Sequence, residues 1–201
     1  MIIYQGAEAI IERIDEIIIK RRVEKKYRIK ELDEKIRKDR NKKEIKLLKE
    51  VRRIGINVPK VIEESDFWFS MEYIDGRKLK DVLNENNYEF FSTELGKIIG
   101  LLHKNNIVHG DLTLSNLLVD DENRIWLIDF GLGEFTTSLE KKAEDLLTLL
   151  YSIKSSYPQL TEVFIKTFFD SYKRVYEDGE KVMERMKKIL QRGRYVIRDV
   201  N

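Results

Sequence analysis

Two short motifs in the second half of the chain carry residue types suited to phosphoryl transfer. Residues 109–116 read HGDLTLSN, and residues 127–131 read LIDFG. The carboxylate of Asp111 can accept a hydroxyl proton or orient a nucleophile, whereas Asn116 and Asp129 offer the hard oxygen ligands that Mg²⁺ requires. Each motif alone is a weak signal. Together, with Asp129 18 residues after Asp111, they predict a site where metal ions hold nucleotide phosphates.

The two motifs are separated by a predicted β-hairpin. Residues 117–119 and 124–128 are short apolar runs, and the polar residues 120–123 between them favour a turn. Paired strands would hold both motifs in place. The alternative interpretation is two unrelated turns, one of them with an N-capping aspartate.

The first 75 residues have the pattern of a five-stranded sheet with one helix. Apolar runs predict strands at residues 2–4, 9–13, 17–22, 61–62 and 67–73. A helical pattern covers residues 30–54, and Gly55 and Pro59 follow it as stop signals. Its predicted apolar stripe consists of Leu32, Ile36, Leu47, Leu48 and Val51.

Lys20 and Glu44 have the placement of a buried ion pair. Lys20 ends a β-branched run at residues 17–19. Glu44 lies on the same predicted helix face as Ile36 and Leu48. Because burying an unpaired carboxylate is costly, Lys20 is its expected partner, and such a lysine can bind the α- and β-phosphates of a nucleotide. The alternative is a surface lysine and a partly exposed glutamate.

Two further segments are placed to bind a nucleotide. The loop between the first two strands has the position of a phosphate-covering loop and consists of Gln5, Gly6, Ala7, Glu8 and Ala9. With a single glycine, it is also compatible with an ordinary turn. Glu72 and Ile74 precede the predicted turn at residues 75–76, and their backbone groups are expected to hold adenine.

The rest of the chain is predicted to be helical. One helix runs from Phe91 to Leu102 towards the first motif, and three more cover residues 139–155, 161–176 and 180–191. The predicted fold class is α+β, with two lobes. Residues 1–75 form the five-stranded lobe, and residues 76–201 form a minimal helical lobe with a basic C-terminal tail.

Composition limits the kind of protein. The chain has 201 residues, 42% hydrophobic and 37% charged, which is enough to build a core and argues against disorder. The absence of cysteine excludes a disulfide framework and thiolate metal sites. No apolar run is long enough to span a membrane, and the first residues carry no secretion signal, so we expect a cytoplasmic protein.

Positive charge is concentrated near both ends. Residues 20–60 hold 18 Lys and Arg against 7 Asp and Glu, and residues 185–201 hold 6 against 1. Such asymmetry indicates a polyanionic partner such as RNA, or else solvated helix faces. The residues expected to contact RNA from the tail are Arg192, Arg194 and Arg198.

The combination of these motifs resembles the small atypical kinase/ATPase subunit of the KEOPS complex, a relative of the RIO kinases. The resemblance covers essentially the whole chain and includes the RGR sequence at residues 192–194. It implies a two-lobed protein-kinase-like fold, use of ATP and Mg²⁺, and a role in making threonylcarbamoyladenosine in tRNA. It also implies that a synthase subunit binds the C-lobe and a small accessory subunit the N-lobe, or that kinase and synthase form one polypeptide.

Three departures from ordinary protein kinases are visible. Gly110 stands where arginine is usual, and Thr113 where serine/threonine kinases have lysine. Only residues 132–138 separate the LIDFG motif from the next predicted helix. These departures predict an ATPase with weak serine/threonine kinase activity and no phosphorylation switch. The alternatives are a small-molecule kinase of the aminoglycoside or choline type and a non-catalytic scaffold.

Asp145 and the two histidines are titratable residues outside the predicted phosphate and metal ligands. Asp145 resembles the aspartate that braces the catalytic loop of kinases, but it is also compatible with a first-turn acid favoured by the helix dipole. His103 is expected to be a helix-end residue, and His109 to pack beneath the loop rather than act as a base.

Overall fold

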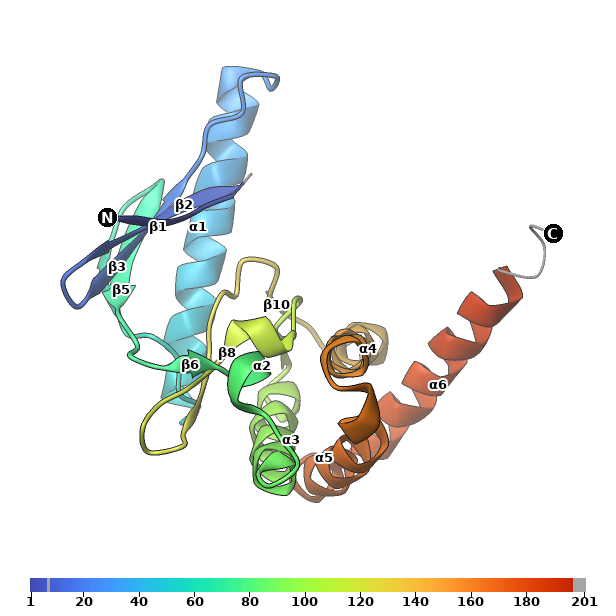
Figure 1. The fold of residues 1–201 in the computed structure, drawn as a ribbon. Coiled ribbons are helices and arrows are strands. Elements are labelled where there is room, and N and C mark those ends of the chain that lie inside the picture. The colour runs from blue at the N-terminus through green and yellow to red at the C-terminus, as the bar shows by residue number, and fades with distance from the viewer. Residues whose placement is uncertain (7, 197–201) are drawn as a thin grey trace.

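The computed structural model describes residues 1–6 and 8–196, with side chains described as far as Arg192. Its first part is a five-stranded antiparallel sheet with one long helix (Figure 1). In spatial order the strands are β1 (Ile2–Gln5), β2 (Ala9–Ile14), β3 (Ile17–Arg22), β5 (Trp68–Glu72) and β4 (Val61–Glu64). All five predicted strands are confirmed.

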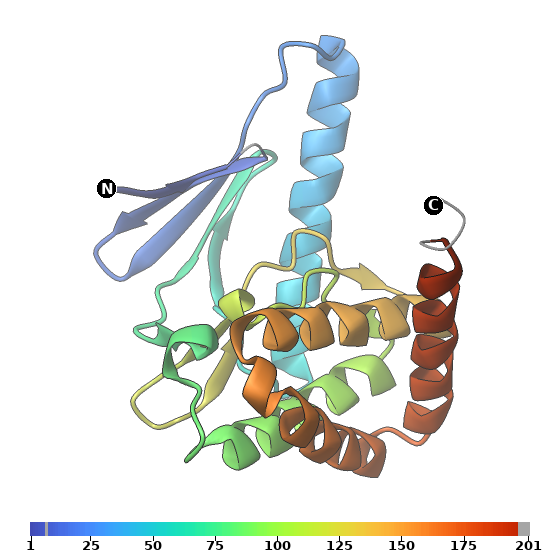
Figure 2. The ribbon, with the colours of Figure 1, turned by 45° about the vertical axis from the view of Figure 1, so that its right-hand side comes forward.

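Helix α1 (Lys30–Arg53) packs along the sheet, and its N-terminal turns project beyond the strands (Figures 1 and 2). The predicted apolar stripe is confirmed for Leu47, Leu48 and Val51, which are buried. The prediction is wrong for Leu32, which is exposed because the projecting turns have no core beside them. Asp33 is buried there instead, and it accepts hydrogen bonds from Arg37 and from the backbone N–H of Lys25.

The second part of the chain is mainly helical, with two small sheets. Strands β6 (Arg77–Lys78), β8 (Leu117–Val119) and β9 (Ile125–Leu127) form one sheet. Strand β7 (Ile107–Val108) pairs with β10 (Glu134–Phe135) in the other. The predicted hairpin is confirmed as β8 and β9. The two-residue strands were not predicted, because two residues are too few to show an alternating pattern.

The helices of this part are α2 (Leu79–Val82), α3 (Tyr88–Lys104), α4 (Leu139–Ser156), α5 (Thr161–Val175) and α6 (Gly179–Val196), with short 3₁₀ turns at Leu114–Asn116 and Pro158–Leu160. Helices α3 and α5 approach closely because Gly96 faces α5. A Cβ at this position would lie 2.4 Å from the carbonyl oxygen of Phe168. The four larger helices predicted in this part of the chain are confirmed as α3, α4, α5 and α6.

Helix α6 is longer than the sequence pattern predicted. It packs mainly against α4, where it buries Val182 and Met186. Its last turns then extend away from the other helices (Figures 1 and 2). Arg192 and Arg194 consequently lie within the helix rather than in a tail that follows it.

One hydrophobic core connects the sheet-bearing part to the helical part. Its members include Leu47 of α1, Phe69 of β5, Leu127 of β9 and Phe168 of α5. Because the same core packs on both parts, it fixes the sheet and α1 relative to the two sequence motifs. In the part of the chain that the structure describes, no helix has the length and apolarity needed to cross a bilayer.

Candidate active site

The HGDLTLSN loop is held in place by Asp145, a buried residue of α4. One carboxylate oxygen accepts the backbone N–H of His109 at 2.6 Å, and the other accepts that of Gly110 at 2.7 Å. Burial alone would raise the pKa of Asp145, but the hydrogen bonds that its carboxylate accepts from His103 and from the backbone N–H of His109 hold that pKa below its usual value. The interpretation of Asp145 as a loop brace is confirmed, and that of a first-turn acid is wrong.

His103 contacts the carboxylate of Asp145 and helps to hold it in position. Its side chain is fully buried, with Nδ1 2.8 Å from the hydroxyl of Tyr172 and Nε2 3.3 Å from the carboxylate of Asp145. Burial lowers the pKa of His103, although Asp145 opposes the shift. A neutral ring that donates from Nε2 and accepts the tyrosine proton at Nδ1 satisfies both contacts. His103 is thus more than the helix-end residue expected, because it links α3, α4 and α5.

Within the loop, Asp111 and Asn116 are joined directly. The side-chain amide of Asn116 donates at 2.9 Å to a carboxylate oxygen of Asp111 and at 2.9 Å to its carbonyl oxygen. The amide oxygen of Asn116 accepts no hydrogen bond from the described residues and can bind a metal ion. His109 lies beneath the loop, buried, with Nε2 3.0 Å from the carbonyl oxygen of Ile128. The expectation that His109 packs under the loop is confirmed.

Lys20, Glu44 and Asp129 meet between the sheet, helix α1 and the LIDFG motif. The ammonium group of Lys20 lies 2.7 Å from Glu44 and 2.8 Å from Asp129. Lys20 and Glu44 are buried, whereas the side chain of Asp129 is 47% exposed. The predicted pairing of Lys20 with Glu44 is therefore confirmed.

Electrostatics favour the charged forms of Lys20 and Asp129. Burial would lower the pKa of Lys20, but the carboxylates of Glu44 and Asp129 outweigh it and raise that pKa. Burial would likewise raise the pKa of Asp129, but the opposite effect of Lys20 is larger, and the pKa is lowered.

Asp129 also has a left-handed backbone, with φ of 65°. Such a conformation is uncommon outside glycine and is often found at functional sites.

Arg22 is a member of this cluster that sequence reasoning missed. Its guanidinium is buried and donates to the second carboxylate oxygen of Glu44. The signal was present, because residues two apart on a strand share a face and Arg22 lies two positions after Lys20. Glu44 thus holds two cations, one on each oxygen.

Gly110 has a steric explanation. Its φ is +81°, and a Cβ there would lie 2.3 Å from the carbonyl oxygen of Leu132. The segment after the LIDFG motif crosses directly over this glycine. No side chain fits at position 110, so the arginine usual in protein kinases is excluded by the path of the backbone.

The segments expected to bind the nucleotide are described in part. The backbone N–H of Gly6 donates to the carbonyl of Ala9, which closes the turn after Gln5. Glu8 makes ion pairs with Lys25 and Arg40. Ala7 lies outside the described residues. Their roles stay predictions.

The remaining predicted site residues are Glu72, Ile74 and the three arginines of the C-terminal segment. The carboxylate of Glu72 accepts the backbone N–H of Lys60 at 3.0 Å. The backbone N–H of Ile74 donates to no group in the described part of the chain. Arg192 is exposed, Arg194 is described only in its backbone, and Arg198 lies outside the described residues.

Asn116 and Asp129 fit magnesium by their chemistry. Among the residues that the structure describes, no three His, Cys, Asp or Glu side chains gather as a complete metal cage. Magnesium is commonly bound by one or two carboxylates together with water and substrate phosphates, so an incomplete protein ligand set suits it.

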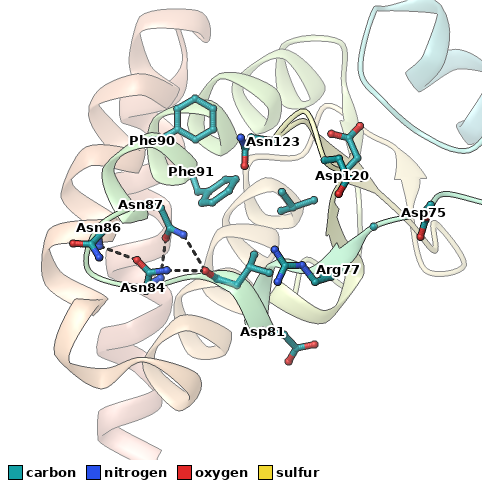
Figure 3. Close-up of a pocket in the computed structure, with 14 residues that line it drawn as sticks. Asp75, Arg77, Asp81, Asn84, Asn86, Asn87, Phe90, Phe91, Asp120 and Asn123 are labelled. Atoms are coloured by element: carbon teal, nitrogen blue, oxygen red, sulfur yellow. Dashed lines mark hydrogen bonds between the residues drawn. The ribbon is translucent and has the colours of Figure 1, made fainter.

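A cavity of about 750 Å³ lies apart from these residues (Figure 3). It is bordered by the segment after Ile74, by α2, by the start of α3 and by the β8–β9 turn. Asp75, Asp81 and Asp121 line it, and none of these carboxylates forms an ion pair with another described residue. Asn84 bonds with Asn86 and Asn87 on one rim. No predicted catalytic or metal-binding residue lines this cavity.

Comparisons with known proteins agree with this geometry. A family model of the protein kinase domain matches residues 15–153. A probable bifunctional tRNA threonylcarbamoyladenosine biosynthesis protein from Methanosarcina barkeri is 38% identical over 195 residues, which cover 94% of this chain. The chain spans only 35% of that relative's length.

A second relative matches end to end. A probable serine/threonine-protein kinase BUD32 homolog from Archaeoglobus fulgidus is 36% identical, with 98% of each chain covered. Among solved structures, a Rio2 kinase–ADP/Mg²⁺–phosphoaspartate complex from Chaetomium thermophilum has a TM-score of 0.66 at 15% identity, covering 96% of this chain and 70% of that one. This likeness shows the fold alone and confirms the predicted two-lobed kinase fold. The chain belongs to the protein kinase family, and within it to the group of the BUD32-type serine/threonine-protein kinase homologues.

Proposed function

We propose that this chain is a Mg²⁺-dependent ATPase and weak serine/threonine kinase that serves a KEOPS-type assembly making threonylcarbamoyladenosine in tRNA. One observation carries the proposal. Lys20 of the sheet reaches both Glu44 of α1 and Asp129 of the LIDFG motif, at 2.7 and 2.8 Å. This contact joins the phosphate-binding and metal-binding halves of a kinase site. The name of the Methanosarcina barkeri relative supports the tRNA pathway.

We place the nucleotide in a cleft between the sheet and the LIDFG motif, and each residue there has a proposed role. Lys20 binds the α- and β-phosphates, and Glu44 holds Lys20 in place. The loop of Gln5, Gly6, Ala7, Glu8 and Ala9 covers the phosphates, while backbone groups of Glu72 and Ile74 hold adenine. Asn116 and Asp129 hold magnesium, which when bound neutralises charge on the phosphate oxygens. Asp111, positioned by its hydrogen bond from Asn116, orients the attacking hydroxyl or water.

The segment after the LIDFG motif favours water over a protein as the main acceptor. Strand β10 pairs with β7, and the hydroxyl of Ser138 caps α4 by accepting the N–H of Lys141. The segment is therefore short and fixed at both ends, which leaves no extended platform for a peptide substrate. Water needs no such platform.

The partners are proposed from the family resemblance. A synthase subunit binds the C-lobe, a small accessory subunit binds the N-lobe, and tRNA contacts Arg192, Arg194 and Arg198. We place the lobe boundary at residues 75–76. Because tRNA is the proposed substrate, we place the activity in the cytoplasm.

A reconstituted reaction tests this function. The chain would be combined with its synthase partner, tRNA, ATP and the threonylcarbamoyl donor, and threonylcarbamoyladenosine and ADP would be measured. We expect both products to require the chain, and Lys20→Ala to reduce both while Lys154→Ala, an exposed control, does not. Modification that proceeds equally well without the chain would contradict the proposal.

The cavity in Figure 3 favours a second candidate, a kinase for amine-bearing small molecules. Its unpaired carboxylates would suit an aminoglycoside or amino alcohol. The absence of Asp111 from its lining weighs against this candidate, because an acceptor must reach that residue. Thermal-shift titration with such amines distinguishes the two functions. If an amine stabilises the wild type but not Asp81→Asn, the result would favour the small-molecule kinase.

A further inference from the structure

Strand β3 presents two cations to the cleft rather than one. Lys20 and Arg22 are both buried, whereas Arg21 between them is exposed and pairs with Glu12 on the other face. Arginine at a buried position of a strand requires partners for its five N–H donors. The geometry of Arg22 shows which partners it has and which it lacks.

The guanidinium of Arg22 is only partly satisfied. One Nη donates to Glu44, but Nε is buried and has no hydrogen-bond partner among the described residues. Arg22 also faces the LIDFG motif, since its Nη2 would lie 3.9 Å from a Cβ built on Gly131, next to Lys20 Nζ at 3.7 Å. The guanidinium, with one donor unsatisfied, therefore lies close to the LIDFG motif, where nucleotide phosphates are proposed to bind.

Strand order indicates which phosphate is involved. Ile17 pairs with Glu72, at the proposed adenine end of the cleft, and Lys20 pairs with Phe69 further along. Arg22 lies two residues beyond Lys20, about 7 Å further from the adenine end. If Lys20 binds the α- and β-phosphates, Arg22 is placed towards the terminal phosphate.

The balance of charge leads to the same conclusion. Lys20 and Arg22 are matched by Glu44 and Asp129 as long as Asp129 contacts Lys20. If Asp129 binds magnesium instead, Glu44 alone faces two buried cations. An uncompensated buried charge is costly, so an anionic group must complete the cluster, and the planar fork of arginine matches phosphate well.

We propose that Arg22 is a second phosphate-binding residue of the cleft, which contacts the terminal phosphate of ATP beside Lys20. This inference rests on the proposed function. It supplies a cation from the N-lobe in a protein whose catalytic loop has Thr113 where serine/threonine kinases have lysine.

The test compares the binding of two nucleotides that differ in the terminal phosphate. Affinities for ADP and for a non-hydrolysable ATP analogue, each with Mg²⁺, would be measured by calorimetry for the wild type and for Arg22→Gln. We expect the variant to lose about tenfold or more in affinity for the ATP analogue and less than about threefold for ADP. Arg21→Gln, the matched control on the opposite face, should change neither affinity.

Equal losses for the two nucleotides would overturn the proposal, because Arg22 would then act only through Glu44 and Lys20. No loss for either nucleotide would also overturn it. If Arg22→Gln does not fold, Arg22→Lys carries the test, since it keeps the charge but loses Nε and the fork. A selective loss for the ATP analogue is again expected, and an unchanged ratio of affinities contradicts it. A wild-type protein that binds neither nucleotide would instead refute the proposed function.

Discussion

Single residues in the candidate active site are held in conformations and surroundings that stability alone would disfavour. Lys20, Arg22 and Glu44 are buried ions, and Asp129 has a left-handed backbone. Replacing a buried ion cluster with apolar residues is often neutral or stabilising, so such a cluster is weak support for a purely structural role. Its contact with Asp129 of the LIDFG motif is instead that expected of a site adapted to bind a charged substrate.

Gly110 provides the first prediction. Gly110→Ala should destabilise the fold by about 4 kcal/mol, because it combines a left-handed backbone with a Cβ placed 2.3 Å from a carbonyl oxygen. Gly55→Ala is the matched control, since Gly55 has φ of +88° but open space around it. That variant should lose only about 1 kcal/mol. The free energy of unfolding in urea measures both, and equal losses would mean that the crossing of Leu132 over Gly110 is not a constraint.

At this scale, sequence reasoning identified residues whose chemistry has a spacing rule. Asp111, Asn116 and Asp129 belong to motifs, and Lys20 could be paired with Glu44 because an unpaired buried carboxylate is costly. The structure confirms that pair and leaves the proposed roles as predictions. Arg22 and the buried position of His103 were missed, since arginine at a strand end and histidine at a helix end are ordinarily exposed.

Helices α3, α4 and α5 together hold the HGDLTLSN loop. Tyr172 of α5 and His103 of α3 connect to Asp145 of α4, which in turn holds the loop through two backbone N–H groups. Three helices thus fix the loop that carries Asp111. A change in the packing of these helices should be transmitted to the loop.

The charge state of His103 makes this arrangement sensitive to acid. The folded protein keeps His103 neutral because burial lowers its pKa, whereas the unfolded chain takes up a proton near pH 6.5. The stabilisation is therefore present above about pH 6.5 and is lost as pH falls towards the lowered folded pKa. Asp145, whose folded pKa is also lowered, loses its stabilisation only near pH 4 and below.

We predict that His103→Gln reduces this dependence, because glutamine keeps hydrogen-bonding groups but does not titrate. Between pH 7.5 and pH 5.5 the wild type should lose about 1 kcal/mol more of its free energy of unfolding than the variant. Urea denaturation at the two pH values measures the difference, and His109 is common to both proteins. The same pH dependence in wild type and variant would contradict the assignment.

Long, strongly patterned elements were predictable from the sequence, whereas contacts between elements were not. The five strands of the sheet and the larger helices follow from apolar periodicity. Strands β6, β7 and β10 form because segments distant in the sequence pair in the folded chain. No local sequence pattern therefore predicts them. The predicted burial of Leu32 was wrong for a related reason. Periodicity identifies a helix face but does not show how far the hydrophobic core extends along that face.

At the scale of the whole molecule, the end of helix α6 both projects from the other helices and carries basic residues. The helix extends away from the bundle (Figures 1 and 2), and Arg192 is exposed on it. A projecting basic helix is suited to contact a phosphate backbone, but charge alone does not identify the partner. The expectation of tRNA comes from the resemblance and from the relative's name.

A pair of charge reversals tests this contact. Arg192→Glu with Arg194→Glu should weaken tRNA binding and make the plot of log affinity against log salt concentration less steep by about 2, since two phosphate contacts are lost. Lys154→Glu with Lys166→Glu changes the net charge equally at exposed positions on α4 and α5 and should leave the slope unchanged. Filter binding with the synthase partner present measures both. Identical slopes for the two double variants would exclude α6 as the RNA contact.

The central claim is that the two motifs form one metal-dependent nucleotide site, and Asp129→Asn tests it most directly. Asparagine tolerates the left-handed backbone and keeps an oxygen for the N–H of Gly131, so the fold should remain intact by circular dichroism and thermal melting. The measurement is ATP hydrolysis with Mg²⁺ or with excess EDTA. We predict Mg²⁺-dependent turnover by the wild type and a loss of about 100-fold or more in the variant. Unchanged hydrolysis by a folded Asp129→Asn protein would contradict the account.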